Sequence, residues 1–199
     1  MRSRKQPNPD RYSVDYYPPE TFYPAEEDCD FFTMVTKPPG KNHIHVVTAD
    51  EVIDRLHQLP EWMLDTLNVV QLSTVTRKMQ TFPCYGLQWN TTVYLYSMHN
   101  SLVEHFHKAP PATFFNETKM YGAKWKQLGV RWELHWKPST IKDYYLNNIL
   151  IHEMGHLIDD RNQSTVDRER YAEAFAIEYG YLKSTRPARR RHRRRHKGK

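Results

Sequence analysis

The chain has 199 residues and a formal net charge of +6 at pH 7, with 13 prolines and two cysteines. This length suits one domain with appendages and is sufficient for a hydrophobic core. The sequence has no stretch of about 18 consecutive apolar residues, which excludes a membrane-spanning helix. The N-terminal Met-Arg-Ser-Arg-Lys-Gln is not followed by the apolar run of a signal peptide, and Cys29 and Cys84 form no disulfide framework. We therefore expect a cytoplasmic protein without membrane contact.

The two ends of the chain differ in composition from its middle. Residues 1–40 contain seven of the 13 prolines, a density that resists helix and sheet, so we predict a partly disordered leader. Residues 188–199 carry eight Lys or Arg and no acid, whereas the remainder of the chain has 21 basic and 23 acidic residues. We predict a disordered basic tail over residues 184–199. Its residues 188–199 would contact polyanions or nucleic acid nonspecifically, through the release of counterions.

Residues 41–183 are predicted to form one domain. Apolar residues at helical spacing predict a helix after residue 48, a short helix over residues 60–67 and another helix around residues 99–107. Alternation of apolar and polar residues predicts strands, and these cover residues 43–48, 69–76, 91–97 and 130–136. The last of these strands leads directly into the helix that carries the main motif of the chain.

The start of this helix is marked by Pro138 and by a capping-box pair of Thr140 and Asp143. The helix is predicted to extend through residues 152–156, His-Glu-Met-Gly-His. Glycine costs roughly 1 kcal/mol relative to alanine inside a helix, so Gly155 indicates that another element approaches the backbone closely at this point.

The two histidines of the motif predict a metal site. Imidazoles four positions apart lie on the same face of a helix, so His152 and His156 can bind one Zn²⁺. Glu153 would remain free to take a proton from a zinc-bound water. An outer carboxylate often fixes the tautomer of a zinc-binding histidine, and Asp159 or Asp160 is the candidate for this role.

A catalytic zinc site needs a third protein ligand and one open position. Metzincins use a third histidine six positions after the second, but this position is Asn162, and the next histidine after His156 is His192 in the tail. The third ligand is therefore expected to be a carboxylate on the next helix. Zinc would be bound at one ion per chain.

That helix is predicted to begin at Ser164, which forms a capping pair with Asp167. Glu169 and Glu173 both lie at the border of its apolar stripe, and periodicity does not choose between them. Glu178 points away from the stripe and is expected to be a solvated charge.

The segment Ala-Glu-Ala-Phe-Ala at residues 172–176 resembles the Glu-x-Phe-Ala segment that supplies the third zinc ligand in many gluzincin metallopeptidases. Together with the histidine motif, it is similar to the compact domain of the anthrax-lethal-factor-like family, which includes the pro-pro endopeptidases, or to a minimal gluzincin. The resemblance implies Glu173 as the third ligand. It also implies an α+β, zincin-like fold, in which a small, twisted, mostly antiparallel sheet accompanies the motif helix and the glutamate helix.

The chain departs from this family at the residue that stabilises the oxyanion. The family has a tyrosine seven positions before the ligand glutamate, whereas this chain has Val166. Tyr144, Tyr145 and Tyr171 could substitute, and the sequence does not select one of them.

These features predict a zinc-dependent endopeptidase with Glu153 as general base and His152, His156 and Glu173 as metal ligands. Its partner would be a peptide or protein substrate, paired in extended form with an edge strand, for which residues 91–97 are a candidate. The alternative hypothesis is a non-enzymatic, metal-stabilised binding module that its basic tail tethers to nucleic acid.

Overall fold

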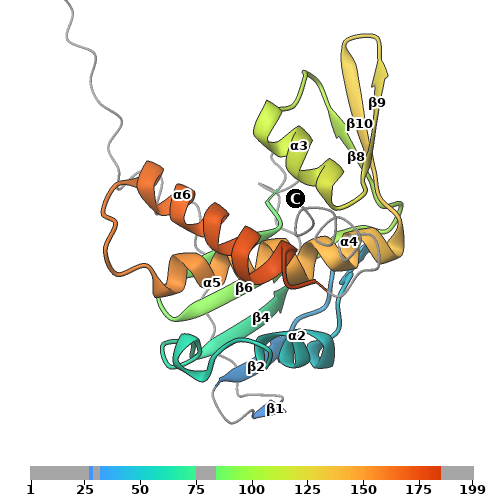
Figure 1. Cartoon of the computed structure of the whole chain (residues 1–199). Coiled ribbons are helices and arrows are strands. Elements are labelled where there is room, and N and C mark those ends of the chain that lie inside the picture. Colours follow the sequence, from blue (N-terminus) through green and yellow to red (C-terminus); the bar gives the residue numbers. More distant parts are fainter. Residues whose placement is uncertain (1–26, 29–31, 75–83, 185–199) are drawn as a thin grey trace, which may run out of the picture.

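A five-stranded sheet with helices packed against it dominates the computed structural model, which describes residues 27–28, 32–74 and 84–184 (Figure 1). In spatial order its strands are β1 (Glu27–Asp28), β2 (Thr33–Thr36), β4 (Val69–Ser73), β6 (Thr92–Tyr96) and β5 (Gly86–Trp89). The three inner strands are parallel to one another, and each outer strand is antiparallel to its neighbour. The α+β class is therefore confirmed, but this sheet is mixed, with a parallel centre and antiparallel outer strands, and is not mostly antiparallel.

The parallel pairing of β2 with β4 requires a long crossover, and α2 (Ala49–Leu56) lies in it. Thr48 caps this helix, because its side chain accepts from the backbone N–H of Glu51 while the Glu51 carboxylate accepts from the backbone N–H of Thr48. The short helix predicted after residue 60 is a single turn of 3-10 helix, Glu61–Met63. β5 and β6 form a hairpin, and its turn contains Asn90 in the left-handed region at φ 50°.

The prediction that residues 1–40 precede the domain is wrong for its last part. β2 is an inner strand of the sheet, and Phe32, Met34 and Val35 are buried in the core. The apolar run that contains these residues is short and lies among prolines, which concealed it. The rest of the predicted leader, at residues 1–26 and 29–31, lies outside the described residues together with Cys29 and with residues 185–199 of the tail.

The motif helix runs from Pro138 to Ile158 without a break, but it is not uniform. α4 (Pro138–Tyr144) is followed by the π-helical segment η2 (Tyr145–Ile149) and then by α5 (Leu150–Ile158). Thr140 lies at the third helical position, where its hydroxyl accepts from the backbone N–H of Lys137. The helix therefore begins at Pro138 as the sequence indicated, but the predicted capping pair is wrong, because Lys137 is the capping position and the Asp143 carboxylate accepts from the Asn147 side chain.

The second helix of the site also ends in a π-helical segment. α6 (Thr165–Phe175) begins at Ser164, whose hydroxyl accepts from the backbone N–H of Asp167 as predicted, and it continues into η3 (Ala176–Tyr181). The two π-helical segments touch so closely that a Cβ at Gly180 would lie 1.9 Å from the carbonyl oxygen of Asn147. Arg55 of α2 joins both segments, because Nε donates to Asn147 Oδ1 at 2.8 Å and Nη2 donates to the Tyr179 carbonyl at 2.6 Å.

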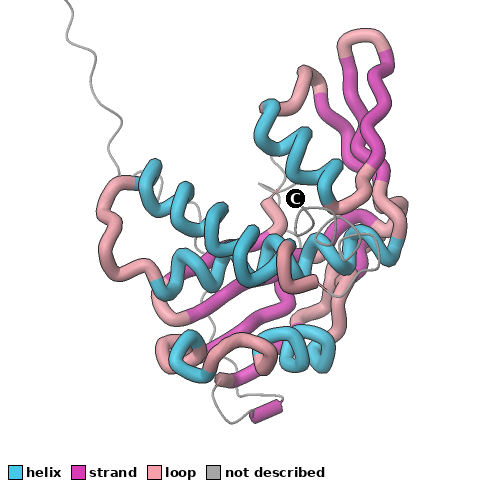
Figure 2. The backbone as a smooth tube through the Cα atoms, in the orientation of Figure 1, coloured by secondary structure: helices cyan, strands magenta, loops and turns pink. Residues whose placement is uncertain are grey.

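Residues 103–137 form a separate part of the fold, here named the hairpin lobe, which Figure 1 shows at the top right and Figure 2 shows as strands beside a helix. Its strands, in spatial order, are β8 (Val103–Phe106), β10 (Arg131–His135) and β9 (Lys124–Leu128), and its helix is α3 (Ala112–Met120). Just before the lobe, β7 (Met98–His99) pairs with β3 (His43–Ile44). None of the described helices is long and apolar enough to cross a membrane.

The helix expected around residues 99–107 is wrong, because this segment forms β7 and β8. Its apolar residues fit helical spacing by chance, but the segment forms a strand because it pairs with β10. In this pairing Val103 lies opposite His135, and Phe106 lies opposite Trp132. The helix of the lobe, α3, was not expected, since its apolar residues do not form a clear stripe.

The packing of α5 against α6 gives a first testable prediction. A Cβ at Gly155 would lie 2.9 Å from Ala172 Cα and 3.2 Å from Phe175 Cβ. Helix propensity favours alanine over glycine by about 1 kcal/mol. Because there is no room for the methyl group, we expect Gly155→Ala to lower the free energy of unfolding by about 1–3 kcal/mol, measured by urea denaturation. An equal or higher stability would show that the two helices can separate without cost.

A buried tyrosine–glutamate pair gives a second prediction. The Tyr85 hydroxyl donates to Glu104 Oε2 at 2.5 Å, and burial raises the pKa of the Glu104 carboxyl from 4.5 to about 7. Between these pH values the folded chain binds more protons than the unfolded chain, so stability falls as the pH rises from 4.5 to 7. Glu104→Gln should remove this fall, of about 3 kcal/mol, from the pH profile of the unfolding free energy. Identical profiles for both proteins would contradict the assignment.

Candidate metal centre

Two histidines and one glutamate converge between α5 and α6. His152 and His156 lie one turn apart on α5 with ring centroids 4.7 Å apart. Glu169 of α6 reaches both rings, with Oε2 at 3.4 Å from His152 Nε2 and Oε1 at 3.5 Å from His156 Nε2. One ligand atom from each residue lies within 4.8 Å of the other two. The side chains of the histidines are 21% and 13% exposed, so the group is accessible from solvent.

The spacing of these atoms fits a shared cation. Bonds of about 2.0–2.1 Å to a tetrahedral Zn²⁺ place any two ligand atoms about 3.3–3.4 Å apart. Each imidazole faces a different oxygen of the Glu169 carboxylate, and these nitrogen–oxygen distances of 3.4 and 3.5 Å lie close to this value and exceed the length of a charge-assisted hydrogen bond, about 2.7–2.9 Å. Imidazole and carboxylate are also the donor types that zinc accepts, so the residues fit this ion.

Glu173, the expected third ligand, does not belong to this group. The side of α6 that packs on α5 carries Ala172 and Phe175, and Glu169 lies almost one turn before Ala172 on that side. Glu173 is one position further round the helix and is exposed. The structure therefore places Glu169 where the family resemblance implied Glu173. Of the two residues that periodicity could not separate, Glu169 is the one that lies beside the histidines, and the identity of the third ligand stays a prediction.

The close approach of the two helices depends on Gly155, as its sequence position indicated. Any side chain at this position would meet the backbone of Ala172. The missing Cβ thus lets α6 approach α5 until the Glu169 carboxylate reaches the histidines.

Glu153 is buried beside the two histidines and points toward β5. Burial raises the pKa of its carboxyl, and the neighbouring His152 and His156 and a hydrogen bond from the backbone N–H of Gln88 offset part of this rise. A Cβ at Gly86 would lie 2.9 Å from both Cγ and Oε1 of Glu153, so this glycine makes room for the carboxylate. A carboxyl group with a raised pKa is suited to accept a proton near neutral pH.

A further carboxylate approaches the group from the hairpin lobe, and sequence reasoning missed it because α3 was not expected. Glu117 Oε1 accepts from the Tyr144 hydroxyl at 2.5 Å and from Asn148 Nδ2 at 2.7 Å. Burial raises the pKa of Glu117, while the hydrogen bond from Tyr144 and the charge of His152 lower it. The charges of His152 and Glu173 both act on this group, so the lobe reaches the edge of the site.

The candidate oxyanion donors differ in their surroundings. The Tyr144 hydroxyl donates to Glu117, and the Tyr145 hydroxyl donates to the carbonyl of Tyr96 at 2.8 Å, so both are engaged inside the protein. Tyr171 is half-buried on α6 and stacks against Phe175. The identity of the oxyanion donor stays a prediction, and Tyr171 is the candidate whose hydroxyl is not committed to Glu117 or Tyr96.

Two other side chains near the motif have structural roles. Asp159 Oδ1 accepts from the backbone N–H groups of Arg161 and Asn162, which fixes the loop between α5 and α6. The Cys84 thiol donates to the Gly86 carbonyl at 3.0 Å, and burial, followed by the charge of Glu153, raises its pKa to about 11. Cys84 therefore remains a neutral thiol near neutral pH and is not suited to act as a nucleophile.

The geometry predicts that Glu169 and Glu173 contribute unequally to zinc binding. We expect Glu169→Gln to weaken zinc affinity by more than the ~10- to 100-fold that loss of an outer partner causes. Glu173→Gln should change the affinity little, because its carboxylate lies outside the group of ligand atoms. Competition with a chromophoric chelator measures both constants. A larger loss in the Glu173 variant would restore the assignment implied by the family resemblance.

Comparison with protein-family models, curated proteins and solved structures found no match for this chain. What the site can do chemically therefore has to be inferred from its own geometry. That geometry combines a three-atom metal-ligand group with a buried carboxylate and the outer strand of a sheet.

Proposed function

We propose that this chain is a zinc-dependent endopeptidase. The observation that carries the proposal is the convergence of His152, His156 and Glu169 beside the buried carboxylate of Glu153. A site that used zinc only for stability would be closed by four protein ligands, whereas the part of the chain that the structure describes offers three here, and they are accessible to solvent.

The residues divide into ligands and a proton carrier. His152, His156 and Glu169 would hold Zn²⁺, which supplies a Lewis acid and lowers the pKa of water when it is bound. Glu153 is one residue from His152 and does not belong to the ligand group. Its carboxylate would accept a proton from the attacking water and return this proton to the leaving amine nitrogen.

The strand β5 would orient the substrate. β5 is the last strand of its sheet and packs against α5, whereas the expected candidate, residues 91–97, forms the inner strand β6. The backbone N–H of Gln88 donates to Glu153, so the outer edge of β5 faces the proton carrier. An extended peptide that adds to this edge would pass directly beside the three ligands.

Replacement of Glu153 tests the assignment of the base. Glu153→Gln retains the size of the side chain and removes its basicity, so the variant should still bind about one zinc per chain and lose ~10²–10⁴-fold in cleavage rate. The measurements are metal analysis of the purified protein and cleavage of a fluorogenic peptide library.

Two controls make this experiment decisive. Glu178→Gln changes an exposed acid on η3 and should affect neither zinc content nor cleavage. Undiminished cleavage by Glu153→Gln would refute the base assignment. A zinc-loaded wild-type protein that cleaves no member of the library would refute the proposed activity.

A further inference from the structure

The outer face of the three-stranded sheet in the hairpin lobe carries more positive than negative side chains. Residues that lie directly opposite each other in a sheet share a face, and the register pairs His135 with Lys124, Glu133 with Lys126 and Arg131 with Leu128. His105 of β8 lies opposite Glu133 and therefore joins the same face. This surface is named the basic face.

The opposite face of the same sheet carries the aromatic residues and is covered by α3. Trp125 stacks on Phe115 at a centroid distance of 5.5 Å, and Trp132 meets the same ring edge-on at 6.1 Å. Trp125 also contacts Phe106 of β8 at 5.1 Å. These aromatic side chains therefore pack inside the lobe, whereas the basic face is exposed to solvent.

Acidic groups do not balance the exposed cations of the lobe. Within residues 103–137, all of which the structure describes, the exposed charged side chains are Lys108, Lys119, Lys124, Lys126, Arg131 and Lys137. Two of the three acids of this segment are engaged away from the basic face, and the third, Glu133, lies on that face between two histidines. Glu104 accepts from Tyr85, Glu117 accepts from Tyr144, and Glu133 lies 2.8 Å from His135 Nε2 and 3.5 Å from His105 Nδ1.

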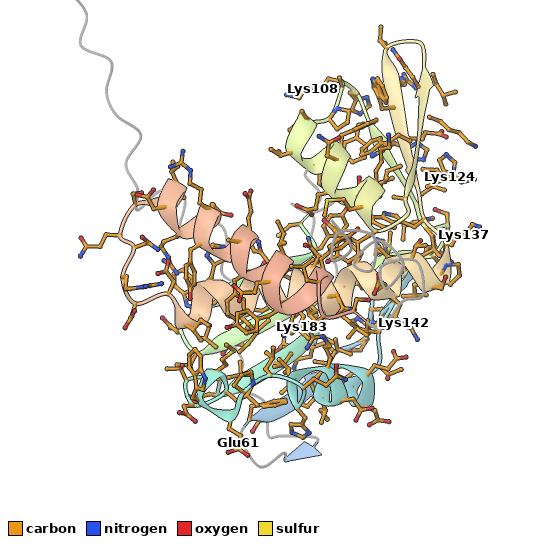
Figure 3. The ribbon with its side chains drawn as sticks, viewed as in Figure 1. Glu61, Lys108, Lys124, Lys137, Lys142 and Lys183 are labelled. Atoms are coloured by element: carbon orange, nitrogen blue, oxygen red, sulfur yellow. The ribbon has the colours of Figure 1, made fainter. Side chains whose placement is uncertain are left out.

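The cations are arranged in a row. Lys124 and Lys126 alternate along β9, so successive side chains on this face are about 6.8 Å apart, and Arg131 continues the row on β10. Figure 3 shows Lys124 and Lys137 on the same side of the molecule, with Lys137 continuing the line beyond the base of the hairpin. A row of regularly spaced cations matches a linear array of anions better than it matches one anionic group.

We propose that the basic face binds the phosphate backbone of double-stranded nucleic acid. A duplex presents such a linear array, because each of its strands carries one phosphate charge about every 3.4 Å along the helix axis. Recognition of single strands relies on exposed aromatic side chains that stack on bases, and here Trp125 and Trp132 face α3. An anionic membrane would be met by the exposed apolar tip residues Leu128 and Val130, whereas Lys124 and Lys137 lie at the far end of the hairpin, away from this tip.

Neutralisation of the row tests the proposal in the full chain. The variant combines Lys124→Gln, Lys126→Gln and Arg131→Gln, and the probe is a short fluorescein-labelled DNA duplex of mixed sequence. Each lost phosphate contact lowers the slope of log K against log salt by ~0.9, so the slope should become shallower by about 2.7. Fluorescence anisotropy over a salt series measures this slope. Residues 188–199 are unchanged in this variant, so any contribution from them is constant.

A matched variant separates a local contact from the overall charge. Lys41→Gln, Lys108→Gln and Lys183→Gln remove the same charge from exposed positions outside the basic face and should leave the slope unchanged. Circular dichroism checks that both variants are folded. An equal change of slope in the two variants would overturn the proposal. Wild-type binding to phosphatidylserine vesicles without binding to the duplex would overturn the assigned partner.

Discussion

The contact between α5 and α6 at Gly155 is the constraint on which the metal centre depends. The three candidate ligands come from two helices, and only the distance between the helix axes decides whether the acidic oxygens reach the imidazoles. A hydrogen atom at position 155 in place of a methyl group permits that distance. The helix loses some intrinsic stability through the glycine, about 1 kcal/mol, and the packed interface compensates for it. The same contact determines that Glu169, and not Glu173, faces the two imidazoles.

Those parts of the fold that local chemistry specifies could be predicted from the sequence. The cap formed by Ser164 needs only its own side chain and a backbone group three residues later. The pairing of His152 with His156 follows from helical geometry alone. The closeness of another backbone at Gly155 could also be anticipated, because glycine in a helix has a cost that some contact must offset.

Features that depend on distant partners could not be predicted. Val103 and Phe106 satisfied a helical pattern, yet β10 provides a strand for them to pair with. Phe32 and Met34 belong to an inner strand, but the prolines around them dominate the local composition. Glu169 and Glu173 are equivalent in a helical projection, and the orientation of α6 against α5 distinguishes them. In each of these cases tertiary packing determined the structure, and the local sequence pattern did not.

The π-helical turn at residues 145–149 fixes the direction in which the histidines face. A π-helical turn accommodates one more residue than an α-helical turn, and each residue advances a helix by about 100°. In a uniformly α-helical rod His152 and His156 would keep their mutual spacing, but both would be rotated by more than a quarter of a turn relative to α4. The widened turn therefore rotates α5 about the helix axis relative to α4. As a result, α4 can bury its own apolar side while the imidazoles of α5 face α6.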